Sequence, residues 1–561
     1  MTDPALERLS RALRAAVRSA GGDESFEPEL SRPRDRGHGD WATNAALVLA
    51  GPLGQPPHDI ARRIAGELDL EAAGVAGVEV AGPGFLNFRL ADEGMWERLV
   101  ELIQAGEAWG RSEGGSGRRV NVEFVSANPT GPLHVAHGRG AALGDAVASL
   151  LDWTGHDVTR EFYINDAGNQ IRLLAESVEA RYQQARGREA EVPEGGYQGD
   201  YIATLAEQLA ARLGVEGLDA LSVDDRLARF EAAAVESMRR GQADDLERFG
   251  VHMDVWFSET SLYESGAIER LLTRLDDADL TYRSEGALWL NTSAFGDEKD
   301  RVLIKGDGSY TYFLPDLAYH LDKADRGFDL TIDVWGADHQ GHEKRMLAAL
   351  AGLGLPDLLE VLILQLVTVM RGGEEARMSK RAGRFVTLGD LVDETGPDVT
   401  RYFFLMRRAE VHLNFDLDLA LDTSEANPVY KIQYAHARMC SVFEKGGIEP
   451  EAVEASLDGL DELETEAERA VAAAVLRLPE AIGAAARARA PHILCTYLEE
   501  VSGLVNSWYH QGNLDPALRM LADGPAREGR IKLARAVQVT LRNGLIALGV
   551  SAPRSMSRET T

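Results

Sequence analysis

The sequence predicts an α/β protein with a doubly wound parallel sheet. Two observations support this fold class: short apolar strands alternate with helical segments from Arg119 onward, and a turn rich in Pro and Gly follows the first strand. Strands separated by helices return to one sheet through crossovers, so they run parallel. In such sheets, ligands bind where the carboxyl ends of strands meet the amino ends of helices.

The chain is long enough for several domains. It has 561 residues, 45% of them apolar, and its 59 basic and 90 acidic residues give a formal net charge of −31. At roughly 150 residues per domain, we expect three or four domains. The acidity argues only weakly against a nucleic-acid partner, because the local field at a binding surface decides that attraction.

Residues 1–110 are expected to form a small α+β domain. The opening helix has apolar residues at helical spacing, and residues 78–81 and 85–88 predict two strands joined by a Gly-Pro-Gly turn. The next segment, 111–118, contains the string SEGGSG, which is typical of a linker.

Residues 119–400 are expected to hold the parallel sheet. Its predicted strands are residues 120–125, 158–164, 330–335 and 361–369. A helix expected over 138–151 makes one βαβ unit with the first two strands. The charged and mostly helical residues from about 168 to 280 are expected to interrupt the sheet as an insertion.

Residues 401–561 predict a helical end of the chain, with helices only from about residue 427. Residues 527–558 reverse the overall charge, because seven basic residues stand against one acidic residue and leave a charge of +6. Arg535 and Arg542 are seven residues apart, so they share one edge of the expected helix.

Cysteine content and hydropathy indicate a soluble protein of the cytoplasm. Cys440 and Cys495 are far apart in the sequence and exclude both a disulfide scaffold and a cysteine-based zinc site. No signal peptide is expected at the start, and the most apolar stretch, 358–370, is too short to cross a bilayer. We therefore expect no membrane partner.

A motif with two histidines, SANPTGPLHVAHG over residues 126–138, follows the first predicted strand. Its prolines and glycine predict a tight turn, and His134 and His137 share one face at the start of the next helix. A helix amino end attracts phosphate, and two imidazoles there can donate to the phosphate oxygens of a nucleotide. The alternative is a pair of surface histidines. A zinc site is disfavoured, since the motif lacks the Glu of a zinc-binding helix and a nearby Cys.

A basic motif, RMSKRAG over residues 377–383, follows Arg371-Gly372-Gly373. Glycines on both sides indicate a mobile loop whose cations can close over a triphosphate. Lys380 can then neutralise the charge that develops as pyrophosphate leaves. The alternative is an ordinary basic surface loop.

Together the two motifs resemble the two signatures of class I aminoacyl-tRNA synthetases. Further stretches are similar to those of arginyl-tRNA synthetases, in family order: 39–44, 82–85, 161–170, 256–259, 307–316, 336–339, 434–438 and 542–545. The resemblance implies a Rossmann-type catalytic domain with a helical insertion over 119–400. It also implies an additional tRNA-contacting domain over 1–110, and a helical linker with an anticodon-binding domain over 401–561.

Two residues depart from the family's signatures. The third position of the first signature is usually Gly and is Ala136 here, so its methyl group can push the adenine slightly. The second signature usually begins with Lys and begins here with Arg377, which keeps the charge but not the geometry. Its second Lys, often missing in this family, is present as Lys380. Neither departure is expected to inactivate the protein.

The resemblance implies a pocket for arginine. A guanidinium presents five donors in a planar fork, so its site needs carboxylates and amide oxygens. By similarity, Asp316 and Glu259 bind the guanidinium and Tyr312 packs along the side chain. Four further residues are expected to bind the amino-acid end of the substrate, its α-ammonium in particular, or to lie near the same pocket. They are Glu123, Ser126, Asn128 and His339.

Each of these residues has a structural alternative. Asp316 can be the N-cap of a helix that begins at Leu317. Glu259 can be a solvated loop charge, and Tyr312 can be part of the core. Asn128 can simply end the turn before Pro129.

The implied reaction has two steps. The carboxylate of arginine attacks the α-phosphate of ATP, which gives arginyl-adenylate and pyrophosphate, and the 2′-hydroxyl of the terminal adenosine of tRNA(Arg) then takes the arginyl group. The residues expected to bind ATP are His134, His137, Gly138, Met378, Ser379 and Lys380, with both histidines and Lys380 catalytic. ATP with Mg²⁺ is a substrate, no permanent cofactor or resident metal is implied, and a monomer is expected.

The helical end of the chain is expected to bind the tRNA. The residues expected to stack on bases or contact phosphates are Tyr434, His436, Arg438, Arg535 and Arg542. The alternative is a helical bundle with a solvated basic edge.

Two other functions compete with this interpretation. One is another enzyme with this fold, either a different class I synthetase or a small adenylyltransferase, which the length and the helical end disfavour. The other is a non-catalytic tRNA-binding or assembly protein, against which the two histidines and Lys380 argue.

Overall fold

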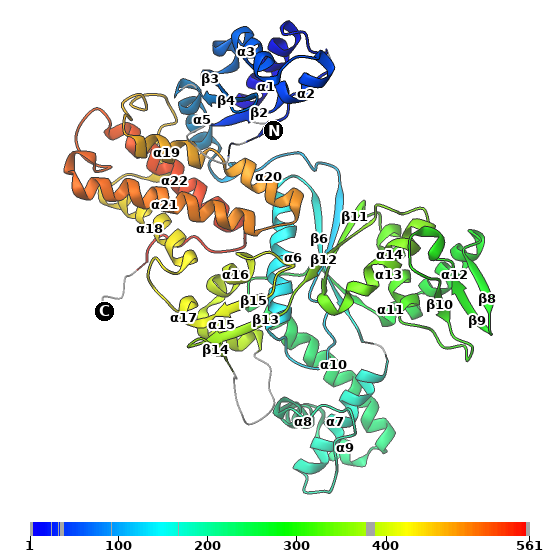
Figure 1. The fold of residues 1–561 in the computed structure, drawn as a ribbon. Helices are drawn as coiled ribbons and strands as arrows, with labels where there is room; N and C mark the ends of the chain where they lie inside the picture. The colour runs from blue at the N-terminus through cyan, green and yellow to red at the C-terminus, as the bar shows by residue number, and fades with distance from the viewer. Residues whose placement is uncertain are drawn as a thin grey trace. The chain divides into compact units, whose positions relative to one another are not determined.

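The computed structural model describes residues 4–23, 25–31, 33, 39–90, 92–166, 168–376 and 387–556. Its contacts divide the chain into two compact units. The first comprises Met1–Gly110, Ala435–Pro479 and Val501–Asn543. The second comprises Arg111–Tyr434, Glu480–Glu500 and Gly544–Thr561. Figure 1 shows the elements of both units.

A five-stranded parallel sheet forms the centre of the second unit. In spatial order its strands are β12 (Leu359–Leu364), β11 (Leu330–Gly336), β5 (Arg119–Glu123), β6 (Asp157–Ile164) and β7 (Val255–Ser258). The order confirms the predicted doubly wound sheet, because the chain starts at β5 in the middle and winds outward in both directions. A ligand site is therefore expected beyond the carboxyl ends of β5 and β11.

Helix α6 (Val135–Trp153) follows β5 and packs closely on the sheet. Most of its residues are buried, and a Cβ on Gly144 would lie only 2.1 Å from Cγ of Phe124. The helix starts three residues before the predicted 138–151, because His134 takes the N-cap position. Both motif histidines therefore lie at the start of the helix.

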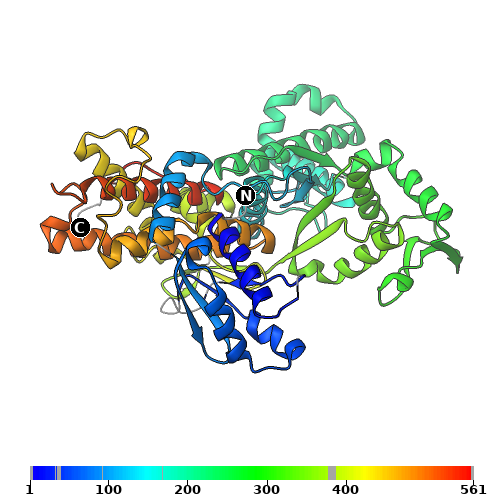
Figure 2. The ribbon, with the colours of Figure 1, turned by 90° about the horizontal axis from the view of Figure 1, so that it is seen from above.

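The predicted helical insertion is real, but its end was placed wrongly. The helices α7 (Asn169–Ala185), α8 (Asp200–Leu213), α9 (Val215–Ala220) and α10 (Val223–Arg248) share a core of their own. Figures 1 and 2 both show them as a bundle beside the sheet. The edge strand β7 lies inside the predicted insertion, and its three apolar residues, Val255 to Phe257, are too short a run to stand out within a long helical region.

A second, smaller sheet that the sequence analysis did not predict precedes β11. The antiparallel strands β8 (Thr281–Ser284), β9 (Ala287–Leu290) and β10 (Arg301–Ile304) form it. It shares one core with α11 (Thr260–Glu264), α12 (Ala267–Asp277), α13 (Phe313–Asp325) and α14 (Gln340–Gly352). Helix α13 thereby comes to lie between this sheet and the central one.

The predicted strand over 361–369 is wrong, because two strands of different sheets occupy it. The first is β12 and the second is β13 (Val367–Arg371), which pairs with β14 (Glu374–Glu375) and β15 (Leu413–Asp416). Only Gln365 and Thr368 interrupt the apolar run, and two isolated polar residues are not enough to divide it into two strands from the sequence. Helices α15 (Leu388–Thr395), α16 (Pro397–Leu405) and α17 (Leu417–Ala420) complete this region.

The N-terminal part of the first unit has the predicted α+β character. Helix α1 (Pro4–Ser19) packs its Leu9, Leu13 and Val17 into a core shared with an antiparallel sheet. The sheet order is β1 (Leu30–Ser31), β2 (Trp41–Thr43), β4 (Phe85–Leu90) and β3 (Val75–Ala81). Helices α2 (Ala45–Leu53), α3 (Pro57–Glu67), α4 (Leu70–Ala73) and α5 (Asp92–Ala105) complete it.

The described residues from Pro428 onward form helices, turns and coil, which confirms the helical end of the chain. The α-helices are α18 (Pro428–Gly446), α19 (Glu466–Val475), α20 (Leu478–Ala488), α21 (His492–Leu514) and α22 (Arg527–Ala547). Within the first unit, Nδ2 of buried Asn543 donates to the backbone carbonyls of Gly106 and Trp109 at 2.9 Å each. These bonds tie α22 to the segment after α5.

Two further features bear on the expected class of protein. Among the helices of the described residues, none is both long and apolar enough to cross a membrane. The described residues also contain no group of three His, Cys, Asp or Glu side chains that could hold a metal ion.

Candidate active site

A cavity of about 650 Å³ lies at the carboxyl edge of the parallel sheet. Residues at or just after the ends of β5, β6, β7 and β11 line it, together with residues of α13 and α14. Six of the seven residues predicted to bind arginine are in its wall: Glu123, Ser126, Glu259, Tyr312, Asp316 and His339. The sheet therefore brings together residues that are far apart in the sequence.

Asp316 and Glu259 face this cavity from two different elements. Helix α13 begins at Phe313 with Tyr312 as its N-cap, so Asp316 lies inside the helix and the N-cap alternative for Asp316 is wrong. Glu259 follows β7 and is only 8% exposed, so it is not a solvated loop charge. Burial, and then the charges of Asp316 and Asp166, raise the pKa of Glu259 to about 7.

Glu259 has no cationic partner among the residues that the structure describes. Its polar neighbours are the hydroxyls of Tyr263, 3.5 Å from Oε1, and of Tyr163. A buried carboxylate beside a second carboxylate is unfavourable until a cation joins them. The pair Glu259 and Asp316 is thus chemically suited to a cationic ligand.

The other two predicted residues on this side lie near the mouth of the cavity. Tyr312 is 88% exposed, so it is not a core aromatic. His339 forms the N-cap of α14, and its Nε2 lies 3.5 Å from Oδ2 of Asp338. Both side chains are accessible to a ligand that enters from solvent.

Sequence reasoning missed His342, which contacts Asp316. Its Nε2 lies 3.1 Å from Oδ2 of Asp316, and its ring meets Phe313 and Trp335 edge-on at centroid distances of 5.9 and 5.4 Å. These aromatic contacts fix the imidazole beside Asp316, although Nε2 of His342 is not in hydrogen-bond geometry with a described residue. His342 stands six residues after the family-like stretch begins at Gly336, which was the only sequence signal near it.

At the other end of the cavity, the chain turns sharply after β5. Val125 and Ser126 have φ of +72° and +43°, a left-handed conformation that is strained for a β-branched residue. The turn directs Ser126 toward the site, where its Oγ donates to Oε1 of Glu123 at 2.9 Å. Asn128 lies outside the cavity wall, and its Nδ2 donates to Oε1 of Gln170 at 2.5 Å.

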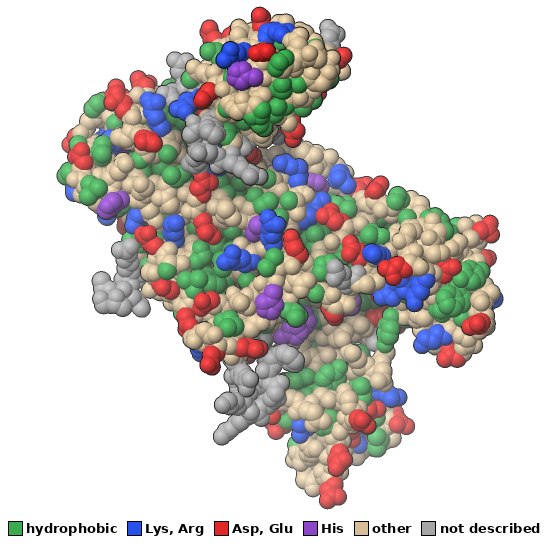
Figure 3. All heavy atoms as spheres, viewed as in Figure 1, with side chains coloured by type: hydrophobic (Ala, Val, Ile, Leu, Met, Phe, Trp, Pro, Cys, Tyr) green, Lys and Arg blue, Asp and Glu red, His purple; other side chains and the backbone are tan. Residues whose placement is uncertain are grey.

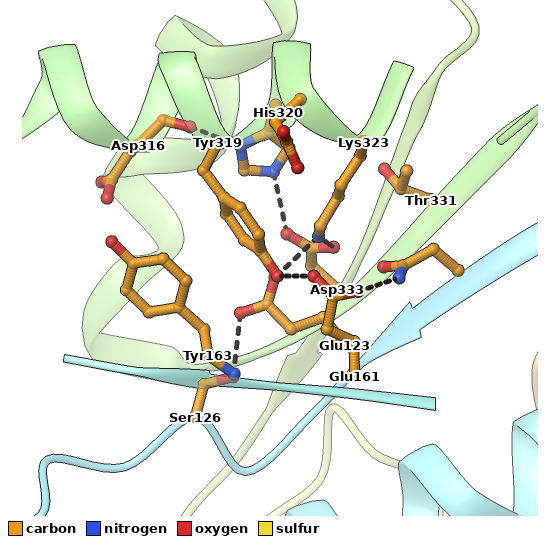
Figure 4. A network of polar contacts seen from close by, with 12 residues as sticks. Glu123, Ser126, Glu161, Tyr163, Asp316, Tyr319, His320, Lys323, Thr331 and Asp333 are labelled. Atoms are coloured by element: carbon orange, nitrogen blue, oxygen red, sulfur yellow. Dashed lines mark hydrogen bonds and ion pairs between the residues drawn. The ribbon is translucent and has the colours of Figure 1, made fainter. Parts of the chain in front are cut away.

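A buried ionic network lies behind Glu123, as Figure 4 shows. Nζ of Lys323 donates to Oε2 of Glu123 at 2.7 Å and to Oδ1 of Asp333 at 2.9 Å. All three side chains are buried. Burial raises the pKa of Asp333, but Lys323 and then His320 outweigh it and bring that pKa to about 2. Asp333 is therefore ionised, and the network joins β5, β11 and α13.

His320 also contacts Asp333 in this network. Its Nδ1 faces the backbone carbonyl oxygen of Asp316 at 2.8 Å, and its Nε2 faces Oδ2 of Asp333 at 2.9 Å. His320 therefore joins α13 to β11, beside the ammonium of Lys323, which contacts the other carboxylate oxygen of Asp333.

The two motif histidines lie together at the amino end of α6. Their rings stack at a centroid distance of 3.7 Å, and Nδ1 of His137 accepts the backbone N–H of His134 at 3.3 Å. Burial, and then the neighbouring His134, lower the pKa of His137 to about 3, and burial also lowers the pKa of His134. His137 is therefore neutral at pH 7, with its proton on Nε2, which can donate to an anion.

The predicted ATP-binding residues of the second motif, Met378, Ser379 and Lys380, lie outside the described residues, as does Arg377. Thr387 follows this motif, and its backbone forms an antiparallel bridge with that of His134. The N–H of Leu388 also donates to the carbonyl of Leu133 at 2.8 Å. Thr387 and Leu388, which follow the second motif in the sequence, are thus held beside the first motif.

Gly138, the remaining predicted ATP-binding residue, has a packing role. A Cβ at this position would lie 2.6 Å from Cδ1 of Leu388 and 3.2 Å from Cε2 of Phe404. The glycine therefore lets α6 approach α15 and α16.

The predicted tRNA-binding residues differ in how they are held. His436 is only 2% exposed, with Sγ of Cys440 3.9 Å from its ring nitrogens, so its ring is not available for stacking on a base. Arg438 donates to Oδ1 of Asn506 at 2.7 Å and lies 4.3 Å above the ring of Tyr509. Tyr434 stacks on Tyr430 at 5.9 Å.

Several basic residues of α22 already have acidic or polar partners. Arg535 donates to Gln538 at 2.7 Å, and Arg542 lies 2.8 Å from Glu107. Arg530 and Lys532 are buried and pair with Glu468 and Glu528. The charge of +6 counted over this stretch therefore overstates its basic surface. On the face in Figure 3, acidic and basic side chains are interspersed.

Three family models match the chain in consecutive segments. The model of the arginyl-tRNA synthetase N-terminal domain matches residues 7–90. The model of the catalytic domain of class I (R) tRNA synthetases matches residues 100–403, and that of the DALR anticodon-binding domain matches residues 432–556.

Curated relatives and solved structures agree with these models. The arginine–tRNA ligase of Bacillus licheniformis is 46% identical over 553 residues, which covers 98% of each chain. That of Geobacillus kaustophilus is 45% identical over 98% of this chain and 99% of its own. The solved arginyl-tRNA synthetase of Thermus thermophilus is 25% identical, with a TM-score of 0.75 over 98% of this chain and all of its own.

Proposed function

The chain belongs to the arginyl-tRNA synthetase family, and from this premise we propose which of its residues perform the family's reaction. It is an arginine–tRNA ligase, which uses ATP to join arginine to tRNA. One observation supports the assignment of residues above all others. The carboxylates of Glu259 and Asp316 face one cavity at the carboxyl edge of the parallel sheet, and Glu259 is buried there without a cation among the described residues.

We propose that the guanidinium of arginine binds between these two carboxylates. Asp316 raises the pKa of Glu259, and a shared cation relieves this repulsion. A planar guanidinium can address each carboxylate with two parallel N–H groups, which the ammonium of lysine cannot do. Tyr312, exposed at the mouth, would cover the aliphatic part of the side chain.

The α-ammonium is proposed to bind at the opposite end of the cavity, where Glu123 and Ser126 lie. Since Lys323 already bonds Oε2 of Glu123, the ammonium would meet the Oε1 side of this carboxylate. Ser126 bonds the same oxygen and would adjust to share it. Asn128 would contact the same end of the substrate, and His339 would lie near the same pocket, both by similarity to the family.

The phosphates of ATP are proposed to bind at the amino end of α6. Neutral His137, with Nε2–H available by its tautomer, would donate to a phosphate oxygen, and His134 would act beside it. The backbone bridge of Thr387 to His134 supports a position for Met378, Ser379 and Lys380 near the same phosphates. Gly138 would contribute through the close approach of the backbone. Mg²⁺ would arrive with ATP.

The proposed chemistry needs no nucleophile from the protein. A carboxylate oxygen of arginine attacks the α-phosphorus of ATP, the bond to the bridging oxygen breaks, and pyrophosphate leaves. The 2′-hydroxyl of the terminal adenosine of tRNA(Arg) then attacks the carbonyl carbon, loses its proton, and AMP leaves. Positioning of the reactants and stabilisation of the phosphate charge would supply the rate enhancement.

The tRNA is proposed to bind Arg438, Arg535 and Arg542, with Tyr434 as a stacking surface. His436 is left out, because its burial prevents contact with a base. We further propose domain boundaries at 1–110, 119–400 and 401–561, a monomeric state, no permanent cofactor and a cytoplasmic location.

Replacement of Asp316 by Asn tests the central assignment. We expect the KM for arginine in tRNA aminoacylation to rise by about 30-fold or more, because removal of one partner of a charge pair that the bound ligand buries costs about 2–5 kcal/mol. Asp325→Asn is the matched control on α13, since Asp325 bonds Arg274 at 3.0 Å and is absent from the cavity wall. An unchanged KM in Asp316→Asn would show that the guanidinium binds elsewhere.

A further inference from the structure

Tyr163 places a hydroxyl in the cavity that the reaction described above does not use. The residue belongs to β6 and lines the cavity. Its hydroxyl oxygen is shielded from solvent and has no partner in good hydrogen-bond geometry among the described residues, although it lies close enough to the carboxyl of Glu259 to interact with it. A buried polar group with incomplete hydrogen bonds destabilises a folded protein, and a ligand that completes them removes this cost.

The position of this hydroxyl is fixed by packing. The ring of Tyr163 clusters with those of Tyr319 and Phe257, at centroid distances of 4.6 and 6.0 Å. Its backbone N–H donates to Oγ of Ser126 at 3.1 Å. Figure 4 shows the hydroxyl pointing toward Asp316. The group is therefore held in place before any ligand binds.

The surroundings of the hydroxyl are acidic. Burial, and then the charges of Glu259, Asp316 and Glu123, raise the pKa of Tyr163. The hydroxyl thus keeps its proton, which a neighbouring carboxylate can accept, while its oxygen remains able to accept one hydrogen bond. The missing partner is a donor, and the charges around it favour a cationic one.

A count of donors identifies which cation fits. The guanidinium of arginine has five N–H groups. Two carboxylates that each receive two parallel N–H groups satisfy four of them and leave one unpaired. The ammonium of lysine has three donors, which two carboxylates can satisfy alone. An additional acceptor in this cavity therefore favours arginine over lysine.

We propose that the hydroxyl oxygen of Tyr163 accepts the remaining N–H of bound arginine and so determines specificity for it. Its own proton would go to Glu259 or Asp316 in the same complex. This inference rests on the proposed placement of the guanidinium between Glu259 and Asp316.

Tyr163→Phe tests the inference, because it removes the hydroxyl and keeps the stacked ring. We expect the KM for arginine to rise about tenfold or more, the typical loss for a hydrogen bond to a charged group. The preference for arginine over lysine, measured as the ratio of kcat/KM in ATP–pyrophosphate exchange with tRNA present, should fall by a similar factor. The melting temperature should stay the same or rise, because an unpartnered buried group is lost.

Tyr182→Phe is the matched control, and we expect the opposite effects on melting temperature and on the KM for arginine. Its hydroxyl donates to Oδ1 of Asp219 at 2.9 Å in the α7–α10 bundle, outside the cavity wall. The control should melt at a lower temperature and keep the KM for arginine.

Two results would overturn the inference. One is an unchanged arginine KM and lysine discrimination in Tyr163→Phe. The other is a rise in KM with a fall in melting temperature and unchanged discrimination, which indicates a structural role. Asp316→Asn, assayed in parallel, separates the two proposals. If it raises the arginine KM while Tyr163→Phe does not, only the inference fails; if neither does, the placement of the guanidinium fails as well.

Discussion

Lys323 and Glu123 form a buried ion pair, in which Nζ of Lys323 donates to Oε2 of Glu123 at 2.7 Å. Lys323 belongs to α13, which also carries Asp316, and Glu123 ends β5, beside Ser126. The pair therefore joins the element that bears one end of the arginine cavity to the element that bears the other. A buried ion pair is a weak source of stability, but the loss of one partner is costly.

Lys323→Met should destabilise the protein by about 3–5 kcal/mol, because it leaves Glu123 and Asp333 buried without their shared cation. Urea denaturation followed by tryptophan fluorescence measures the effect. Lys323→Met combined with Asp333→Asn should recover much of the loss, since one buried negative charge is removed with the positive one. Lys445→Met, at an exposed position, is the control. A wild-type denaturation midpoint for Lys323→Met alone would show that the ion pair does not hold the cavity together.

The affinity for arginine should depend on pH through Glu259. The raised pKa of about 7 means that this carboxyl is protonated below neutral pH and ionised above it. Arginine needs the ionised form, so its KM should fall about tenfold between pH 6 and pH 8. Glu259→Gln should raise the KM and abolish this dependence. If the variant kept the wild-type pH profile, another group would be responsible.

His137→Ala should lower kcat/KM for ATP by about 100-fold, the usual effect of losing one positioned donor to a charged transition state. Because the pKa of His137 is about 3, the KM of the wild type for ATP should not change between pH 5.5 and 8 through titration of this residue. Steady-state kinetics with varied ATP measures both. His252→Ala, at an exposed position, should behave as the wild type. Equal ATP kinetics in His137→Ala and wild type would refute the phosphate contact.

Gly138→Ala separates packing from nucleotide binding. The added Cβ would lie 2.6 Å from Cδ1 of Leu388, so we expect a loss of about 1–3 kcal/mol from overpacking. If Gly138→Ala raises the KM for ATP only through this clash, the double variant with Leu388→Ala should return the KM to the wild-type value, although it leaves a cavity. If the KM for ATP stays high once the space is restored, the glycine acts on ATP directly.

Most of the sheet could be predicted from the sequence because its strands are buried and apolar. Residues 120–125 were predicted as a strand, and β5 has Val120 and Val122 fully buried. The edge strand β7 was missed because its run of three apolar residues is short and lies within a long helical region. The break between β12 and β13 was missed because strand pairing, rather than any local pattern, separates them.

The site was predictable where residues belong to motifs and not elsewhere. Asp316 and Glu259 lie in stretches that resemble the family, whereas Lys323 looks like an ordinary member of a helix. Tyr163 also lies in a family-like stretch, 161–170, but nothing in the sequence there singled out its hydroxyl. Lys323 is 200 residues from Glu123, so only the fold brings them together. The count of basic residues over 527–558 was misleading for Lys532, because its ammonium is buried and paired inside the protein and adds nothing to a basic surface.

A crystal structure of the protein with bound arginine tests the central claim most directly. We expect the guanidinium nitrogens to lie within hydrogen-bond distance of the carboxylates of both Glu259 and Asp316, with the α-ammonium at the Glu123 end of the cavity. Arginine bound with its guanidinium away from both carboxylates, or in the reverse orientation, would contradict the account.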